Sequence, residues 1–112
     1  MQMTFTITLG TTPVNVIKLL KGTAFTGASV AGSRTVDPNL SELANSFILT
    51  ADDANTGTIY GGNRSDVAST DYGFKLESGQ QQSYSDNVPS INLGVYLVAS
   101  GSGQKVHVEF RR

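Results

Sequence analysis

The sequence predicts an all-β protein, a single antiparallel β-sandwich of jelly-roll-like or immunoglobulin-like topology with at most one short helical turn. Segments that alternate apolar and polar residues recur about every 10 residues, with clusters of Gly, Asn, Asp and Ser between them. The 112 residues are the length of one ordinary domain, so we expect a single domain over residues 1–112. No helix of normal length and no strand–helix alternation is evident, which argues against a Rossmann-like nucleotide site.

The N-terminal residues have the most regular alternation. One side carries Met3, Phe5, Ile7 and Leu9, and threonines occupy the positions between them. This pattern predicts a half-buried strand, and Gly10 and Pro13 end it. Because the strand lies at a chain end, we expect residues 1–13 to form an N-terminal arm or edge strand whose apolar row contacts another chain. An internal strand of the sandwich is the alternative.

The next segments are less regular. Residues 14–21 (VNVIKLLK) fit either a strand or a short helix capped by Asn15 and closed by Gly22, and we favour the strand. Residues 22–36 predict a loop or a weak edge strand. One helical turn is expected from Asp37, because Asp followed by Pro suits the start of a helix.

Strands follow in quick succession from residue 46 onward. We expect them at 46–51, 58–62, 74–77, 80–85, 91–99 and 104–110. The sequence SGSG at 100–103 has a suitable length for a hairpin between the last two. Alternation and side-chain size predict the core residues, which are Phe5, Ile7, Phe47, Leu49, Phe74, Leu76, Leu93, Val95, Leu97, Val106, Val108 and Phe110.

Composition excludes several classes of function. The chain has no cysteine, which rules out disulfides, thiolate zinc sites and a cysteine nucleophile. Its 8 basic and 9 acidic residues give a net charge of −1, which argues against broad electrostatic binding to nucleic acid. No apolar run approaches the roughly 20 residues that span a bilayer, and the start lacks the features of a signal peptide. We therefore expect neither a nucleic-acid nor a membrane partner.

The residues that carry chemistry have simpler structural interpretations. His107 is the only histidine, and we interpret it as a half-exposed strand residue because metal sites usually combine several ligands. Residues 52–57 (DDANTG) resemble the start of a calcium loop, but the glycine comes one residue early and no Glu occupies the last position. An Asx turn between two strands explains this segment more simply. We expect no catalytic residue, metal or cofactor.

Two further features bear on partners. Tyr60, Tyr72, Tyr84 and Tyr96 could form a sugar-stacking platform, but we favour packing at sheet edges with the hydroxyl groups in water. The chain ends in Arg111 and Arg112, a short basic tail that could contact an acidic partner surface. The expected contact residues are therefore Met3, Phe5, Ile7, Leu9, Arg111 and Arg112.

Three pieces of the chain, in sequence order, share a pattern with a known family. They are FILTADDANTGTIYGG, FKLESGQQQSY with its Leu-x-x-Gly turn, and LGVYLVASGSGQKVHVEF. This pattern of strands and turns resembles small β-sandwich structural proteins in the virions of tailed bacteriophages. The resemblance covers residues 46–110 and implies a capsid decoration (cement) protein or a head-fibre part, without catalytic residues.

From this resemblance we expect a decoration protein that binds the capsid exterior as a homo-oligomer, with a trimer favoured, and stabilises it. Its partners would be the major capsid protein and further copies of itself, and its location would be the capsid surface of the virion. Symmetric assembly on a repeating lattice would give avidity without strong single contacts. The alternative is a receptor- or glycan-binding domain of a phage head or tail fibre, with a host glycan as its ligand.

Overall fold

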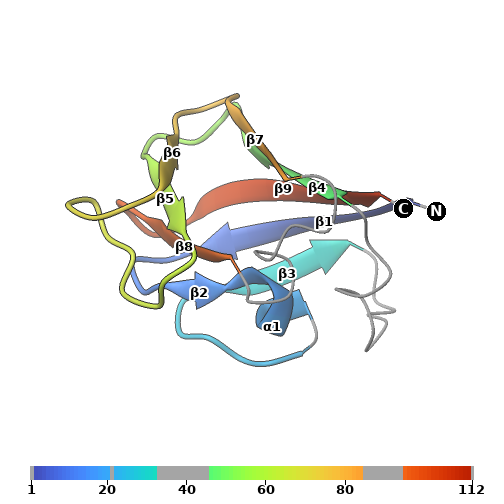
Figure 1. The fold of residues 1–112 in the computed structure, drawn as a ribbon, viewed down its shortest axis with the longest axis horizontal. Helices are drawn as coiled ribbons and strands as arrows, with labels where there is room; N and C mark the ends of the chain where they lie inside the picture. Colours follow the sequence, from blue (N-terminus) through green and yellow to red (C-terminus); the bar gives the residue numbers. More distant parts are fainter. Residues whose placement is uncertain (1, 21, 33–45, 85–94, 112) are drawn as a thin grey trace.

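Two antiparallel sheets face each other and enclose one core (Figure 1). The computed structural model describes residues 2–20, 22–32, 46–84 and 95–111. The larger sheet contains, in order, β3 (Ser29–Gly32), β1 (Gln2–Leu9), β9 (Gln104–Arg111), β4 (Ser46–Ala51) and β7 (Gln81–Tyr84). The smaller sheet contains, in order, β2 (Val14–Asn15), β8 (Tyr96–Ala99), β5 (Ile59–Gly62) and β6 (Phe74–Leu76). The predicted all-β sandwich is confirmed.

The strand order is that of a jelly roll. With β3 set aside, β1-β9-β4-β7 faces β2-β8-β5-β6, and the chain crosses between the sheets after β1, β2, β4, β6, β7 and β8. This connectivity consists of two Greek keys, the arrangement of jelly rolls. An immunoglobulin-like sandwich, the other topology that the sequence allowed, places its first two strands side by side in one sheet. Here β1 and β2 lie in different sheets.

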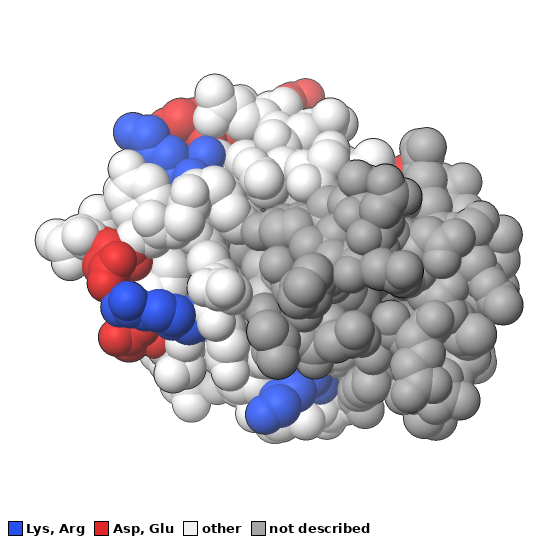
Figure 2. Space-filling model, in the orientation of Figure 1, with Lys and Arg blue, Asp and Glu red and all other residues white. Residues whose placement is uncertain are grey.

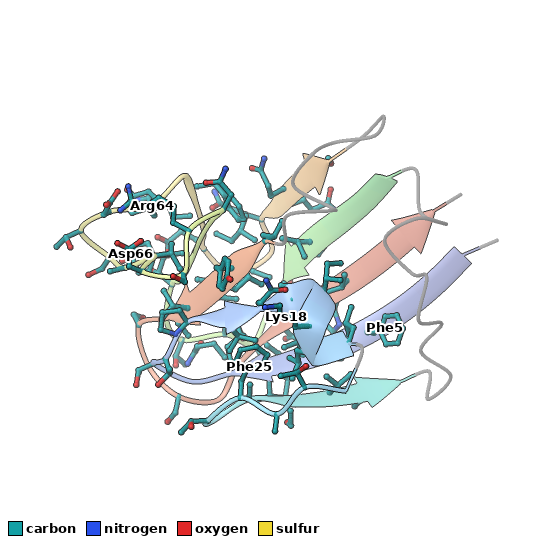
Figure 3. The ribbon with its side chains drawn as sticks, turned by 60° about the horizontal axis from the view of Figure 1, so that its bottom comes forward. Phe5, Lys18, Phe25, Arg64 and Asp66 are labelled. Atoms are coloured by element: carbon teal, nitrogen blue, oxygen red, sulfur yellow. The ribbon has the colours of Figure 1, made fainter. Side chains whose placement is uncertain are left out.

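The strand β1 is internal. It pairs with β9 from Gln2↔Arg111 to Leu9↔Gln104, and β3 pairs with its other side (Figure 3). The prediction that residues 1–13 form an arm or edge strand is therefore wrong, and an internal strand is the outcome. Alternation identifies the two faces of a strand but not its neighbours, which is why the sequence could not decide between them. The weak edge strand expected within residues 22–36 is β3.

The segment after β2 forms a short helix, so the favoured strand at 14–21 is wrong except for its first two residues. In α1 (Val16–Leu20) the Asn15 side chain caps the start, because its Oδ1 accepts a hydrogen bond from the Lys18 amide at 3.0 Å. The Gly22 amide donates to the Leu19 carbonyl and the Thr23 amide to the Lys18 carbonyl. These two bonds and a φ of 108° at Gly22 make a Schellman end. The helical turn expected from Asp37 lies outside the described residues.

The turn at 100–103 is not the predicted hairpin, because it carries the chain from β8 in one sheet to β9 in the other. The Ser100 amide donates to the Thr58 carbonyl, and the Gly103 amide donates to the Leu9 carbonyl, both at 2.9 Å. The turn is thus hydrogen-bonded to two other connections between the sheets, the one from β1 to β2 and the one from β4 to β5. SGSG signals a tight turn, but it does not specify which sheet the chain enters next.

The core contains most of the predicted residues. Those at most 2% exposed are Phe5, Ile7, Leu49, Leu76, Val95, Leu97, Val106 and Val108, and Phe74 packs half-buried against them. Leu93 and the side chains of Phe47 and Phe110 lie outside the described part of the chain. The helix adds four buried side chains to this core, namely Val16, Ile17, Leu19 and Leu20.

Candidate functional site

The loop of residues 63–73 joins β5 to β6 and is well ordered internally. Ala68 and Asp71 form a β-bridge, with both amide-to-carbonyl distances 3.0 Å. Val67 is 4% exposed and anchors the loop to the outer face of the smaller sheet, near Gly62. These contacts hold the loop in one shape.

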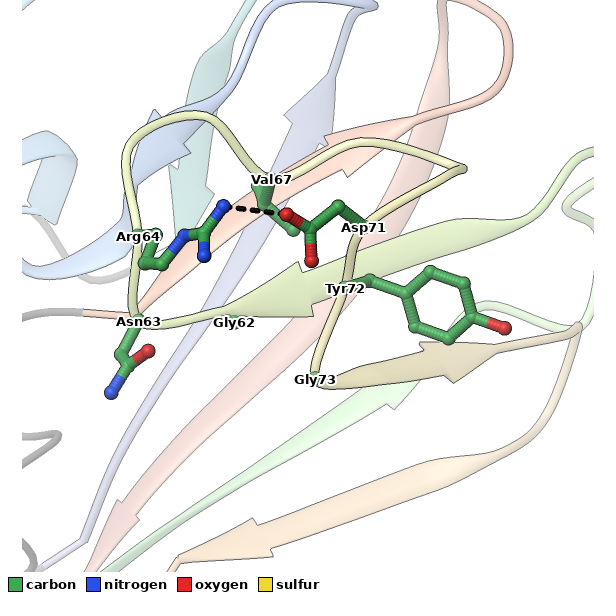
Figure 4. A pocket seen from close by; sticks show the side chains of 7 residues that line it. All are labelled: Gly62, Asn63, Arg64, Val67, Asp71, Tyr72 and Gly73. Carbon is green, nitrogen blue, oxygen red and sulfur yellow. Dashed lines mark hydrogen bonds and ion pairs between the residues drawn. The ribbon is translucent and has the colours of Figure 1, made fainter.

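Ion pairs add to that order. The Arg64 guanidinium binds Asp66 through Nε–Oδ1 at 3.0 Å and Nη2–Oδ2 at 3.2 Å, and it also binds Asp71 (Figures 3 and 4). The hydrogen bond to Asp66 raises the pKa of Arg64 and lowers the pKa of the Asp66 carboxyl. Figure 2 shows acidic and basic side chains intermixed at this end of the molecule rather than gathered by sign. The loop therefore presents no unpaired cation to a ligand through Arg64.

Two hollows flank Val67. The smaller, of about 200 Å³, lies within the loop and is lined by Asn63, Arg64, Asp71 and Tyr72, among others (Figure 4). The larger, of about 480 Å³, is named here the loop groove. Residues that line it include Thr11, Pro13, Tyr60, Ala68, Ser69 and Val98. Of these two hollows, only the loop groove has a volume within the range of ligand pockets, roughly 300–1,000 Å³.

The tyrosines are not arranged as predicted. Tyr60 belongs to β5 and Tyr96 to β8, both central strands of the smaller sheet, so the predicted packing at sheet edges is wrong for them. The ring of Tyr60 lies 5.1 Å from that of Tyr72, at an interplanar angle of 49°. Tyr72 stands out among the described large hydrophobic side chains because it is 43% exposed. The side chain of Tyr84 lies outside the described part.

His107 has the half-exposed position that the sequence predicts, but it also has two partners that the sequence did not indicate. Its Nε2 lies 2.8 Å from Asp52 Oδ2, and its Nδ1 lies 3.0 Å from Thr6 Oγ1. A hydroxyl, an imidazole and a carboxylate are the groups of a nucleophilic triad. Here they lie on the outer face of the larger sheet, and none of them lines either hollow. We interpret the network as a link between β1, β9 and the end of β4.

The calcium-like segment is a turn in which the side chains of Asp52 and Asn55 already accept hydrogen bonds. Asp52 Oδ1 accepts from the Ala54 amide at 2.8 Å. The Asn55 side chain accepts from the Lys105 amide and donates to the Lys105 carbonyl, both at 2.8 Å. This side chain thus extends the hydrogen bonding of β9 by imitating a strand backbone. The Asx-turn interpretation fits these contacts.

The expected contact residues do not form an exposed row. Phe5, Ile7 and Leu9 are at most 1% exposed and belong to the core of their own chain, which is a correction to the expected apolar contact. The side chains of Met3 and Arg111, and all of Arg112, lie outside the described part. What β1 offers to other molecules is its outer, threonine-bearing face.

Comparisons with models of protein families, with curated proteins and with solved structures found no match. Within the described residues, no helix has the length and hydropathy that crossing a membrane requires.

Proposed function

We propose that the protein is a structural protein of a bacteriophage virion, a capsid decoration protein without enzymatic activity that binds the capsid exterior as a homo-oligomer and stabilises it. A trimer is the favoured oligomer, and the major capsid protein is the partner. The observation that carries the proposal is the jelly-roll connectivity, which is common among viral capsid proteins and lectin domains. The resemblance of residues 46–110 to phage virion proteins supports the same function.

The outer face of the larger sheet is the surface that this function would use. It presents small or uncharged side chains over neighbouring strands, including Thr4, Thr8, Ser29, Ala31, Thr50 and Gln81. Among the described residues, the charged side chains on this face are Lys105 and Glu109 of β9 and Asp52 just after β4. Interface centres are depleted of charged residues, so a face of this kind suits a flat contact repeated on a lattice.

The test compares two arginine substitutions at exposed positions. Ala31→Arg places a charge on the outer face of β3, and Ser78→Arg places one in the turn between β6 and β7. Phage heads assembled without this protein are mixed with each purified protein and separated in a density gradient. We expect the wild type and Ser78→Arg to migrate with the heads, and Ala31→Arg to stay unbound. Light scattering gives the oligomer of each variant in solution.

The same experiment separates the proposal from its alternative. Heads that gain resistance to heat when the protein is added support decoration. Heads that neither bind the protein nor gain stability contradict it, and recovery of the protein on a head or tail fibre supports the receptor-binding alternative.

A further inference from the structure

We propose that the loop groove binds a neutral carbohydrate, with the Tyr60 ring against the sugar and the hydroxyl groups of the rim around it. This inference goes beyond capsid decoration and does not depend on it. It assigns a ligand to the larger of the two hollows beside the 63–73 loop, whose volume is about 480 Å³.

The floor of the groove is apolar and contains an aromatic ring. Tyr60 and Val98 pair in register on adjacent strands, so their side chains stand next to each other on the outer face of the smaller sheet. Pro13 and Ala68 continue this apolar surface on either side. A pyranose ring has one face of C–H groups, and such a face packs well against an aromatic ring and aliphatic neighbours.

The rim is polar but carries no unpaired charge among its described residues. Thr11, Ser69 and Ser100 are exposed, hydroxyl-bearing residues that line the groove, and the Ser100 Oγ already accepts a hydrogen bond from the Thr58 amide at 2.9 Å. Asp66 also lines it, and the Arg64 guanidinium already binds both oxygens of that carboxylate. A charged ligand would find no free countercharge here, whereas the hydroxyl groups of a neutral sugar can both donate and accept hydrogen bonds.

The groove is also held in shape before any ligand arrives. The bridge between Ala68 and Asp71, the ion pairs of Arg64 and the buried Val67 fix the loop wall. The ring of Tyr72, 5.1 Å from that of Tyr60, limits how the Tyr60 ring can turn. Binding would therefore lose little conformational entropy, which is how a small site reaches useful affinity.

The first test uses the full chain labelled with ¹⁵N and titrated with the methyl glycosides of glucose, galactose, mannose and N-acetylglucosamine, and with lactose and maltose. We expect saturable shifts of the Thr11, Ser69 and Ser100 amides with at least one probe. Ser69→Trp should abolish binding because its side chain fills the groove. Thr70→Trp, in the same exposed turn but outside the groove lining, should bind like the wild type.

A second pair of variants tests the ring itself. Tyr60→Ala should weaken the affinity about tenfold, because an aromatic contact contributes about 1.4 kcal/mol. Tyr96→Ala removes a half-buried tyrosine from the same sheet face without touching the groove lining, and should retain the affinity. Thermal unfolding verifies that each variant is folded.

Three outcomes would overturn the inference: no saturable binding of any probe, binding that survives Ser69→Trp, or shifts confined to residues far from the groove. None of these bears on capsid decoration, whose readout is cosedimentation with phage heads.

Discussion

The two sheets enclose the same core but differ in the length of their strands. In the larger sheet, β1 and β9 are each 8 residues long and pair along their whole length. In the smaller sheet, β2 has 2 residues, β6 has 3, and β5 and β8 have 4 each. Long ladders support themselves, whereas strands this short depend on the turns and loops around them. Both hollows lie at the smaller sheet, beside the 63–73 loop.

Side chains bonded to backbone hold the turns of the smaller sheet in place. Gln104 is 7% exposed, and its Oε1 accepts from the Thr56 amide at 3.0 Å and the Gly57 amide at 2.9 Å. Its Nε2 lies 3.4 Å from both Thr56 Oγ1 and the Ser102 carbonyl. One residue of the larger sheet thus fastens two of the connections that cross to the smaller one.

The largest effect should come from the shared core. Ile7 of the larger sheet and Leu97 of the smaller one are both 0% exposed. Truncation of either to Ala should lower the free energy of unfolding by about 2–5 kcal/mol, since each leaves a cavity. Urea unfolding followed by circular dichroism measures both. A large loss at Ile7 with almost none at Leu97 would mean that the smaller sheet is not part of the cooperative core.

The same contrast explains what the sequence could predict. Alternation at residues 2–9 and 104–110 identified both long strands and their buried faces, because the period of 2 directly reflects burial. It could not identify strand neighbours, so β1 was expected at an edge and 100–103 as a hairpin. At 14–21 the short apolar run fits both periods. The Asn15 cap and the Gly22 end are helix signals in the sequence, and the helix forms because packing also buries its apolar face.

The candidate site was less predictable. The four tyrosines were identified as a set, but only the pairing of strands brings Tyr60 beside Val98, and only the fold of the 63–73 loop brings Tyr72 against Tyr60. The partners of His107 come from positions 55 and 101 residues away in the chain. Such contacts between side chains distant in sequence leave no local pattern.

The next effect concerns close packing in the smaller sheet. A Cβ at Gly61 would lie 2.2 Å from Cζ of Phe74, its cross-strand partner, whereas a Cβ at Gly62 would be at least 3.4 Å from any neighbour. Gly61→Ala should therefore destabilise by about 1–3 kcal/mol through overpacking, and Gly62→Ala by less. Thermal unfolding compares them. Phe74→Leu should partly rescue Gly61→Ala, and an additive double variant would contradict the proposed clash.

A somewhat smaller loss of stability is expected when the Gln104 hydrogen bonds to the turn at 56–57 are removed. Gln104→Ala leaves the Thr56 and Gly57 amides without their acceptor, and should cost about 1–2 kcal/mol. Gln81→Ala, at an exposed position of β7, is the matched control and should change stability little. Amide hydrogen exchange gives a local readout, since residues 56 and 57 should exchange faster in Gln104→Ala alone. Unchanged exchange there would show that the turn does not depend on this side chain.

The smallest effect concerns acid stability at the His107 network. The hydrogen bond from the Ala54 amide, followed by that with His107, holds the pKa of Asp52 below its ordinary value of 3.8. Because the folded state binds this proton less readily than the unfolded chain, ionised Asp52 favours folding. Its contribution is present above the ordinary value and is lost as the pH falls through the lowered one.

The variant Asp52→Asn should therefore be less stable than the wild type at neutral pH, and the difference should shrink as the pH falls from about 5 to about 2. Asp53→Asn removes the same charge from the neighbouring, exposed position and should keep the acid dependence of the wild type. The stability of all three proteins is measured as the midpoint of urea unfolding at each pH in that range. If Asp52→Asn and Asp53→Asn lose stability in parallel, the effect is one of net charge. If only Asp52→Asn weakens the dependence of stability on pH, that dependence comes from the network that joins β1, β9 and the end of β4. The larger sheet then relies on a side-chain link in addition to its strand pairing.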